Sequence, residues 1–326
     1  MLHIVPAGGD KRLPTVSLKG VKSMPAVKAE RGSAEHRLAR ADLLYLFLLA
    51  SIWGTSFLSI KLSLRGFSPV QNTVGRLWLG ALALLTFSLL RRSRLPRDPI
   101  IWVHLTALAA MANVAPYFLF ALAEQRIDSA IAGVLNATTP IWTAIIAFSI
   151  GSEPVGRRKL AGLILGFTGA VVIFEPWNAG SQVATWSGLA CLVAAALYGV
   201  GFVYAARHLN GRGLTPLTLS AGQLSAAAVL SLLLIPVMGW PEMEFRMDSV
   251  LGMLALGIFG TGVAYVISFR LLANRGASGT ALVTYLIPVV AVIVGAVALR
   301  ERLELNVMLG AAVVLAGVGL IRSDSG

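Results

Sequence analysis

Long apolar runs alternate with short breaks along most of the chain, and the breaks are rich in basic or turn-forming residues. Most runs are close to the ~20 residues that cross a hydrocarbon core of about 30 Å as an α-helix. The fifth and tenth runs are shorter and rich in glycine. The pattern predicts ten transmembrane helices, at residues 43–62, 70–90, 100–123, 130–150, 160–174, 186–206, 214–238, 250–269, 280–299 and 305–321.

The first 41 residues do not share this pattern. They are polar and basic, and they include Pro6, Pro14 and Pro25 but no apolar stretch long enough for the core of a signal peptide. We therefore expect residues 1–41 to form a disordered cytoplasmic tail. Met24 lies inside this tail, so translation could start there, without residues 1–23.

The composition is that of an integral membrane protein. Of the 326 residues, 56% are apolar and 13% are charged, and the mean hydropathy is +0.78. Soluble domains carry about 25% charged residues, so this chain has too few charges to cover a soluble fold of its size. Cys191 is the single cysteine, which excludes an intramolecular disulfide and a cysteine-based metal site.

The distribution of basic residues predicts the orientation in the membrane. A net charge of +12 would suggest a nucleic-acid partner in a soluble protein, but here Lys and Arg fall mostly between the apolar runs. Of the 27 basic residues, 19 lie on the side of the N-terminus and 5 on the opposite side. Cytoplasmic loops carry such an excess. We expect a multi-pass protein of the inner (plasma) membrane with both termini in the cytoplasm, and no nucleic-acid partner.

An internal repeat relates the two halves of the chain. Nearly equal shifts, in the right order, superpose aromatic, glycine and proline positions, which is typical of a repeat architecture. A shift of 148 residues pairs Tyr117 with Tyr265, Pro140 with Pro288 and Glu153 with Glu301; a shift of 145 pairs Trp53 with Tyr198 and Phe57 with Phe202; a shift of 147 pairs Gly75 with Gly222 and Arg76 with Gln223.

The repeat predicts the architecture. Each half, 42–175 and 186–322, holds five predicted helices, and because five is odd the second half must cross the membrane upside down. The expected fold is an all-α integral membrane protein of ten transmembrane helices, arranged as two inverted five-helix repeats. Such repeats commonly support alternating access, so the pattern favours transport over catalysis.

Two prolines at matching repeat positions interrupt the fourth and ninth runs. Pro140 and Pro288 each lack a backbone donor, which frees the carbonyl groups of Asn136 and Thr284. A freed carbonyl needs a partner, so interrupted helices usually face a cavity or another helix. A kink needed only for packing is the alternative.

Aromatic side chains gather in the runs that carry or flank these kinks. Trp53 and Phe57 are four residues apart and share a helix face, as do Tyr198 and Phe202. Core packing is one interpretation, and an amphipathic pocket for an organic solute is the other. Tyr117, Tyr265 and Tyr285 lie in neighbouring runs.

Lys61 and Arg76 are cations within predicted helices. Lys61 is a turn or less from its helix end, so we expect it to reach the interface. Arg76 is about 9 Å into its helix at the usual rise per residue. It could hold a substrate carboxylate, or it could tie helices together through carbonyl groups or through Glu124 and Asp128.

No Asp or Glu lies in the middle of a predicted helix, which gives no support to a carboxylate proton relay. We therefore favour facilitated diffusion, or coupling through other groups. His104 and His208 have no partner at metal or triad spacing. We expect no cofactor, no metal site and no catalytic residues.

The residues also resemble a known family. The stretch from Trp53 to Phe57 with Lys61, Arg76, and the run from Ala130 through Pro140 to Pro154 look like an EamA domain. The run from Ser278 through Pro288 to Arg302 looks like a second copy. This resemblance to the drug/metabolite transporter superfamily covers about residues 41–322. It implies a ten-helix permease or exporter of amino acids and other small metabolites, with a central cavity between its halves.

We therefore expect an exporter of small organic metabolites such as amino acids, and not an enzyme, acting in the lipid bilayer as a monomer or homodimer. A membrane-embedded enzyme acting on lipid or polyprenyl substrates is the alternative, and a membrane scaffold is a third. The expected substrate-binding residues are Trp53, Phe57, Arg76, Tyr117, Asn136, Pro140, Tyr198, Phe202, Tyr265, Thr284, Tyr285 and Pro288.

Overall fold

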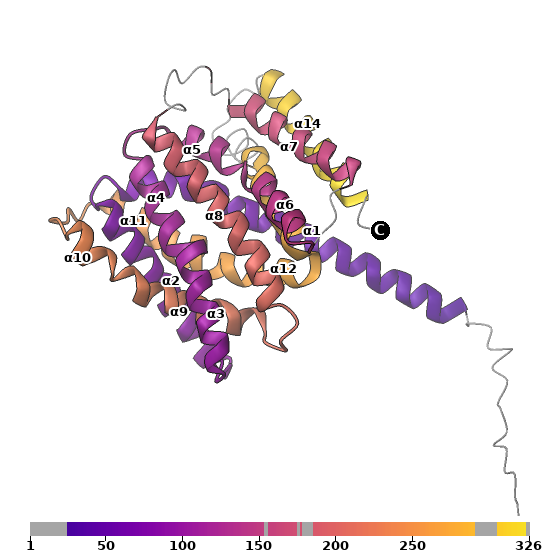
Figure 1. The fold of residues 1–326 in the computed structure, drawn as a ribbon, viewed down its shortest axis with the longest axis horizontal. Helices are drawn as coiled ribbons and strands as arrows, with labels where there is room; N and C mark the ends of the chain where they lie inside the picture. Colours follow the sequence, from indigo (N-terminus) through magenta and orange to yellow (C-terminus); the bar gives the residue numbers. More distant parts are fainter. Residues whose placement is uncertain (1–24, 153–155, 175–176, 178–184, 291–304, 324–326) are drawn as a thin grey trace, which may run out of the picture. The chain divides into compact units, whose positions relative to one another are not determined.

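The computed structural model describes residues 25–152, 156–174, 177, 185–290 and 305–323. These residues are helical or lie in turns and loops, and they include no strand, so the expected all-α class is confirmed for them. The chain divides into two units, Met1–Ala41 and Asp42–Gly326, which we describe separately. The helices of the second unit are drawn in Figure 1.

Helix α1 (Pro25–Ser63) begins within the first unit and continues into the second. Residues 25–41 are helical in the structure, and the cytoplasmic tail predicted for residues 1–41 stays a prediction. This segment is rich in Ala, Lys, Glu, Arg and Leu, which have high intrinsic helix propensity. Residues 1–24 lie outside the described residues, so for them the predicted tail stays a prediction.

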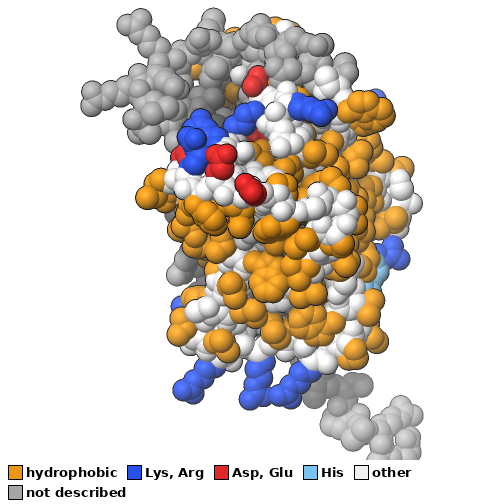
Figure 2. Space-filling model, turned by 90° about the vertical axis from the view of Figure 1, so that its left-hand side faces the viewer, with side chains coloured by type: hydrophobic (Ala, Val, Ile, Leu, Met, Phe, Trp, Pro, Cys, Tyr) orange, Lys and Arg blue, Asp and Glu red, His pale blue; other side chains and the backbone are white. Residues whose placement is uncertain are grey.

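Seven of the described helices are long and apolar enough to cross a membrane. They are Ala41–Ser63, Pro69–Leu90, Pro99–Ala123, Ile131–Ser149, Trp186–His208, Pro216–Met238 and Met247–Ala281, and Met308–Ile321 is a shorter apolar helix. Figure 2 shows the corresponding broad apolar surface, with most of the visible charged side chains above and below it.

The 35-residue span Met247–Ala281 covers the predicted eighth helix and the start of the ninth. Gly276 has a φ of 68° and breaks the helical path there, a conformation that glycine adopts without steric cost. Residues 291–304, which would complete the ninth predicted helix, lie outside the described residues. The count of ten helices and their inverted arrangement remain predictions.

A π-helical segment lies inside the third predicted helix. Residues Ala110–Val114 (η1) join α3 (Pro99–Ala109) to α4 (Ala115–Ala123). Pro116 has no N–H to donate to the carbonyl group of Ala112, four residues earlier. The hydroxyl of Tyr265 donates to that carbonyl oxygen at 2.9 Å. A side chain from the second half of the chain thus satisfies the backbone group that the proline leaves free.

A second π-helical segment, Ala255–Val263 (η3), joins α11 (Met247–Leu254) to α12 (Ala264–Ala281). The Trp53 indole N–H donates to the carbonyl oxygen of Gly260 at 3.2 Å. The 148-residue shift carries 110–114 onto 258–262, which lies within η3. Irregular turns of this kind often occur at functional sites, and here each receives a side-chain donor from another helix.

The prolines predicted to interrupt helices lie close to breaks. Helix α5 (Ser129–Asn136) ends just before Ala137 and Thr138, and α6 (Thr139–Ser149) starts with Pro140 in its first turn. In the second half a turn at Leu282 precedes the helical residues 283–290, which contain Pro288. Both regions are therefore irregular, although the second break comes earlier relative to its proline.

Glycines bring α7 (Arg157–Phe174) and α14 (Leu305–Ser323) into close contact, side by side in Figure 1. A Cβ atom added at Gly162 would lie 2.7 Å from the carbonyl oxygen of Gly317, and one at Gly169 would lie 2.7 Å from that of Gly310. Any larger residue would push the two backbones apart. Small residues allow this approach between helices in lipid, where packing rather than hydrophobicity drives association.

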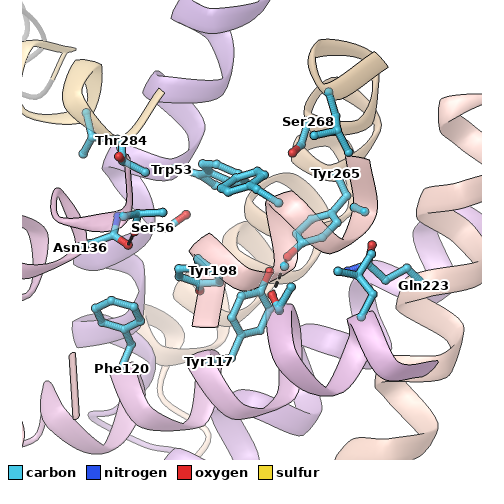
Figure 3. A pocket seen from close by; sticks show the side chains of 18 of the residues that line it. Trp53, Ser56, Tyr117, Phe120, Asn136, Tyr198, Gln223, Tyr265, Ser268 and Thr284 are labelled. Carbon is cyan, nitrogen blue, oxygen red and sulfur yellow. Dashed lines mark hydrogen bonds between the residues drawn. The ribbon is translucent and has the colours of Figure 1, made fainter. Parts of the chain in front are cut away.

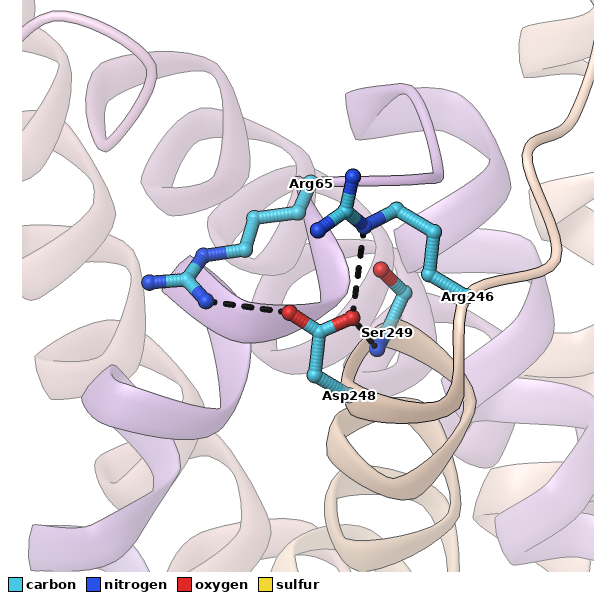
Figure 4. A network of polar contacts seen from close by, with 4 residues as sticks. All are labelled: Arg65, Arg246, Asp248 and Ser249. Carbon is cyan, nitrogen blue, oxygen red and sulfur yellow. Dashed lines mark hydrogen bonds and ion pairs between the residues drawn. The ribbon is translucent and has the colours of Figure 1, made fainter.

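Ion pairs connect both ends of the membrane-crossing part of α1 to the span Met247–Ala281. At one end, Asp42 accepts hydrogen bonds from Arg275 Nε at 2.8 Å and from Asn274 at 2.9 Å. At the other end, Asp248 lies between Arg65, at 3.0 Å, and Arg246, at 3.4 Å (Figure 4). The first pair is largely buried and the second is more exposed.

The remaining described helices complete the second unit. They are α2 (Pro69–Leu90), α8 (Trp186–His208), α9 (Pro216–Ser231) and the short α10 (Leu234–Met238). Helices α2 and α9 pack against each other, and each begins with a proline after a hydroxyl N-cap, Ser68 or Thr215. The 147-residue shift carries the start of one helix onto the start of the other.

Candidate substrate-binding pocket

A pocket lies among helices from both halves of the chain. Three helices line it with the same pattern, in which residues i, i+3, i+4 and i+7 share one helix face. The stripe on α1 starts at Trp53, the stripe on α8 at Tyr198 and the stripe on α12 at Tyr265. Their members are Trp53, Ser56, Phe57 and Ile60; Tyr198, Gly201, Phe202 and Ala205; and Tyr265, Ser268, Phe269 and Leu272.

Aromatic rings form much of the wall, as Figure 3 shows. Phe57 packs edge-on against Phe120, with ring centroids 5.8 Å apart. Phe120 stacks on Tyr198 at 6.0 Å, and Tyr198 contacts Tyr117 at 6.5 Å. This series of rings joins α1, α4 and α8, and it offers flat apolar surface with hydroxyl groups at its edge, which suits an amphipathic solute.

Arg76 is the one charged residue that lines the pocket within the described part of the chain. Its side chain is buried, and the guanidinium carbon lies 3.6 Å from the centroid of the Tyr117 ring. Its Nε donates to the hydroxyl of Thr261, in η3, at 3.3 Å. No described carboxylate lies within ion-pair distance of it. The pocket therefore presents a fixed positive charge held by one residue from each half.

Gln223 lines the same pocket from α9, at the position that the repeat pairs with Arg76. Its amide nitrogen donates to the side-chain oxygen of Asn113 at 2.6 Å. Gln223 Oε1 and Asn113 Nδ2 are buried and have no hydrogen-bond partner among the described residues. Buried amide groups are normally paired, so the unpaired oxygen of Gln223 is an acceptor available within the pocket lining.

Nine of the twelve residues expected at the site line the pocket: Trp53, Phe57, Arg76, Tyr117, Asn136, Tyr198, Phe202, Tyr265 and Thr284. Pro140, Pro288 and Tyr285 do not. The two prolines are buried, Pro140 directly after a helix break and Pro288 within the helical residues 283–290. Tyr285 points elsewhere: it packs against Gly166 of α7 and donates to the carbonyl oxygen of Leu163 at 2.9 Å.

Several lining residues escaped the sequence reasoning, among them Ser56, Phe120, Gly201, Gln223 and Ser268. Helical periodicity was the available signal for those on α1, α8 and α12, because they follow an expected aromatic residue by three or four positions. The repeat offered the signal for Gln223, through Arg76. Phe120 follows Tyr117 by three positions on α4.

The side chain of Lys61 does not extend to the membrane interface as expected. Its ammonium group donates to the backbone carbonyl oxygens of Glu124, at 2.9 Å, and Ile127, at 2.8 Å. It therefore ties α1 to the connection between α4 and α5. Lys61, and not Arg76, therefore ties helices together through backbone carbonyl groups.

These features define a multi-pass membrane protein with a mixed aromatic and polar pocket between its helices. The family model described as the EamA-like transporter family matches residues 41–175 and 185–323. The chain belongs to this family of transporters, within the drug/metabolite transporter superfamily.

Known relatives agree with this assignment. The chain is 27% identical to the uncharacterized transporter YdfC of Bacillus subtilis, over 83% of this chain and 87% of that protein. It is 28% identical to the uncharacterized inner membrane transporter YedA of Escherichia coli K12, over 77% and 80%. A solved crystal structure at 21% identity shares the fold, with a TM-score of 0.67 over 86% of this chain and 97% of that one.

Proposed function

We propose that the protein exports small organic solutes that carry a carboxylate, such as amino acids, by alternating access between two inverted repeats. The observation that supports the solute class is the pocket lining, in which a single buried guanidinium lies among aromatic rings. A buried cation without a carboxylate partner favours an anionic group of a bound solute.

The pair formed by Gln223 and Asn113 extends this argument. The unpaired oxygen of Gln223 can accept a hydrogen bond from a solute ammonium group, while Arg76 holds the carboxylate. An apolar side chain would then lie against Phe120, Tyr198 and their neighbours. Together these groups match the three parts of an α-amino acid with an apolar or aromatic side chain.

The repeat supports the transport mechanism. The two π-helical segments and the helix starts of α2 and α9 recur at the same shifts as the sequence motifs. Two halves with the same architecture can each adopt the conformation of the other, which provides two states of similar energy. We retain the proposal that both termini face the cytoplasm, and reporter fusions that placed the C-terminus outside would contradict it.

The test is flux in proteoliposomes, with phenylalanine, its amide and phenethylamine as radiolabelled solutes. We expect transport of phenylalanine and much weaker transport of the other two, since they lack the carboxylate. Arg76→Gln should reduce phenylalanine flux at least tenfold, because a charge-assisted pair contributes about 1.5–3 kcal/mol. Exposed Arg212→Gln is the matched control. Equal flux of all three solutes would refute the carboxylate assignment.

A further inference from the structure

Glu124 is a buried carboxyl group directly after the span Pro99–Ala123. Its side chain is only 1% exposed, although it follows the last residue of α4 and precedes a short connection. Sequence position alone suggested an ordinary helix-end residue. Ionised carboxylates are rarely buried unless they are paired, so the surroundings of this group decide its state.

The carboxyl group has few direct partners. Glu124 Oε2 accepts a hydrogen bond from the hydroxyl of Ser129 at 2.9 Å. Glu124 Oε1 is buried and has no hydrogen-bond partner among the described residues. The ammonium group of Lys61 binds backbone carbonyl oxygens in the same turn instead, and no described cation lies within 4.0 Å of the carboxylate.

Charged and titratable groups face Glu124 from three neighbouring helices: Lys61 on α1, Arg76 on α2 and Cys191 on α8. Burial raises the pKa of Glu124 to about 8, while the Ser129 hydrogen bond, Lys61 and Arg76 oppose this rise. Near neutral pH the group therefore exists in both protonation states.

Glu124 is coupled to the pocket by contacts and by charge. Phe120, one turn earlier on α4, lines the pocket, and so does Phe57, whose carbonyl oxygen lies 3.4 Å from the Ser129 hydroxyl. Arg76, the charged group of the pocket, acts on Glu124 electrostatically. When Glu124 is ionised it partly neutralises the field of Arg76, which weakens the attraction for a solute carboxylate.

We propose that Glu124 is a proton-binding site linked to the solute site, and that it takes up a proton when a carboxylate solute binds beside Arg76. By thermodynamic reciprocity, protonation of Glu124 then strengthens solute binding by the same factor. The solute part of this inference rests on the proposed function, whereas the proton site itself does not.

The proton site is tested without any solute, by infrared titration of the purified full chain in nanodiscs. We expect the carbonyl band of a protonated carboxyl group to disappear as the pH rises through about 8, and to be absent in Glu124→Gln. Ser129→Ala should move the transition to higher pH, because the lost hydrogen bond favours the ionised form. Glu242→Gln, at an exposed site, should leave the band unchanged.

The linkage is tested with phenylalanine as probe. Its affinity should fall roughly threefold between pH 6 and pH 8.5, a range in which phenylalanine keeps most of its ammonium group, and it should stay constant in Glu124→Gln. Binding at pH 8 should also take up protons from a weakly buffered solution, and the variant should take up none. A wild type without a titrating band would overturn the proton site. A titrating band with pH-independent phenylalanine affinity would overturn the linkage, and absence of phenylalanine binding at any pH would refute the proposed solute class.

Discussion

At the scale of residues, two tyrosines show that the same kind of hydrogen bond can serve different purposes. Tyr265 donates to Ala112 and lines the pocket, whereas Tyr285 donates to Leu163 and lies away from it. Both hydroxyl groups donate to a backbone carbonyl oxygen at 2.9 Å. The two residues therefore form a matched pair for separating binding from stability.

Replacing either tyrosine with Phe should destabilise the protein by about 1 kcal/mol, since each change removes one buried hydrogen bond. Only Tyr265→Phe should also lower the affinity for phenylalanine, by roughly three- to tenfold, because it alters a pocket wall and the carbonyl of η1. Thermal unfolding in detergent and proteoliposome KM values measure the two effects. Equal affinity losses in both variants would contradict the assigned pocket.

Glu124 and Lys61 add a general point at this scale. Both were placed correctly along the sequence, at or near helix ends, yet one is a buried acid and the other binds carbonyl oxygens. Which partner a helix-end side chain finds depends on the elements that pack against it. The position of Glu124 in the sequence therefore did not indicate that it could be a proton-binding site.

At the scale of elements, irregular helices surround the pocket. The π-helical segments η1 and η3 expose carbonyl groups that accept bonds from side chains of other helices. At the breaks near Pro140 and Pro288, carbonyl groups accept bonds from threonine hydroxyls three residues later in the chain. We infer that these irregularities allow helices of each half to bend between two states.

Pro288→Ala should preserve folding, because it restores a backbone donor within the helical residues 283–290 and relieves a clash. Pro140→Ala should also preserve folding, because the first turn of α6 accepts Ala as well, and the change removes the fixed φ next to the break at Ala137 and Thr138. Flux should fall about tenfold, since a bias of only ~1.4 kcal/mol between the two states changes their ratio tenfold. Pro99→Ala is the control, as a proline in the first turn of α3 replaces an N–H that has no helical partner anyway. Wild-type flux in both variants would show that the breaks serve packing alone.

At the scale of the whole second unit, two ion pairs lie at opposite ends of the membrane-crossing part of α1, with Asp42 near its start and Arg65 in the turn just after it. Asp42 pairs with Arg275 at one end, and Asp248 pairs with Arg65 at the other. If the two halves exchange conformations, each ion pair closes one end of the solute path through the second unit. Loss of either pair should then favour opening at its own end.

Asp42→Asn should destabilise the protein more than Asp248→Asn, because the side chain of Asp42 is 9% exposed and that of Asp248 is 31% exposed. We expect a loss of more than ~1 kcal/mol for the first and a smaller loss for the second. Both variants are made in a protein that carries Ser56→Cys. A membrane-impermeant thiol reagent added from one side should then label one variant faster than the parent protein and the other variant more slowly. Labelling from the same side in both would contradict their roles as opposite gates.

The sequence by itself determined the membrane class and most of the membrane-crossing helices, and most of the residues that it predicted for the site line the pocket. Hydropathy decides the first two, since an apolar run of sufficient length has few alternatives to a helix in lipid. Nine pocket residues could be predicted from the aromatic pairs, from Arg76 and from the freed carbonyl groups, because helical spacing fixes which side chains share a face.

Tertiary structure decided what local pattern could not. Tyr285 turns toward α7 because Gly166 leaves room there for its ring. Glu124 is buried because α1, α2 and α8 surround the end of α4, and Tyr265 finds its acceptor because Pro116 frees a carbonyl in another helix. Burial and pairing depend on neighbours that are distant in the chain, and helical periodicity specifies a face but not what packs against it.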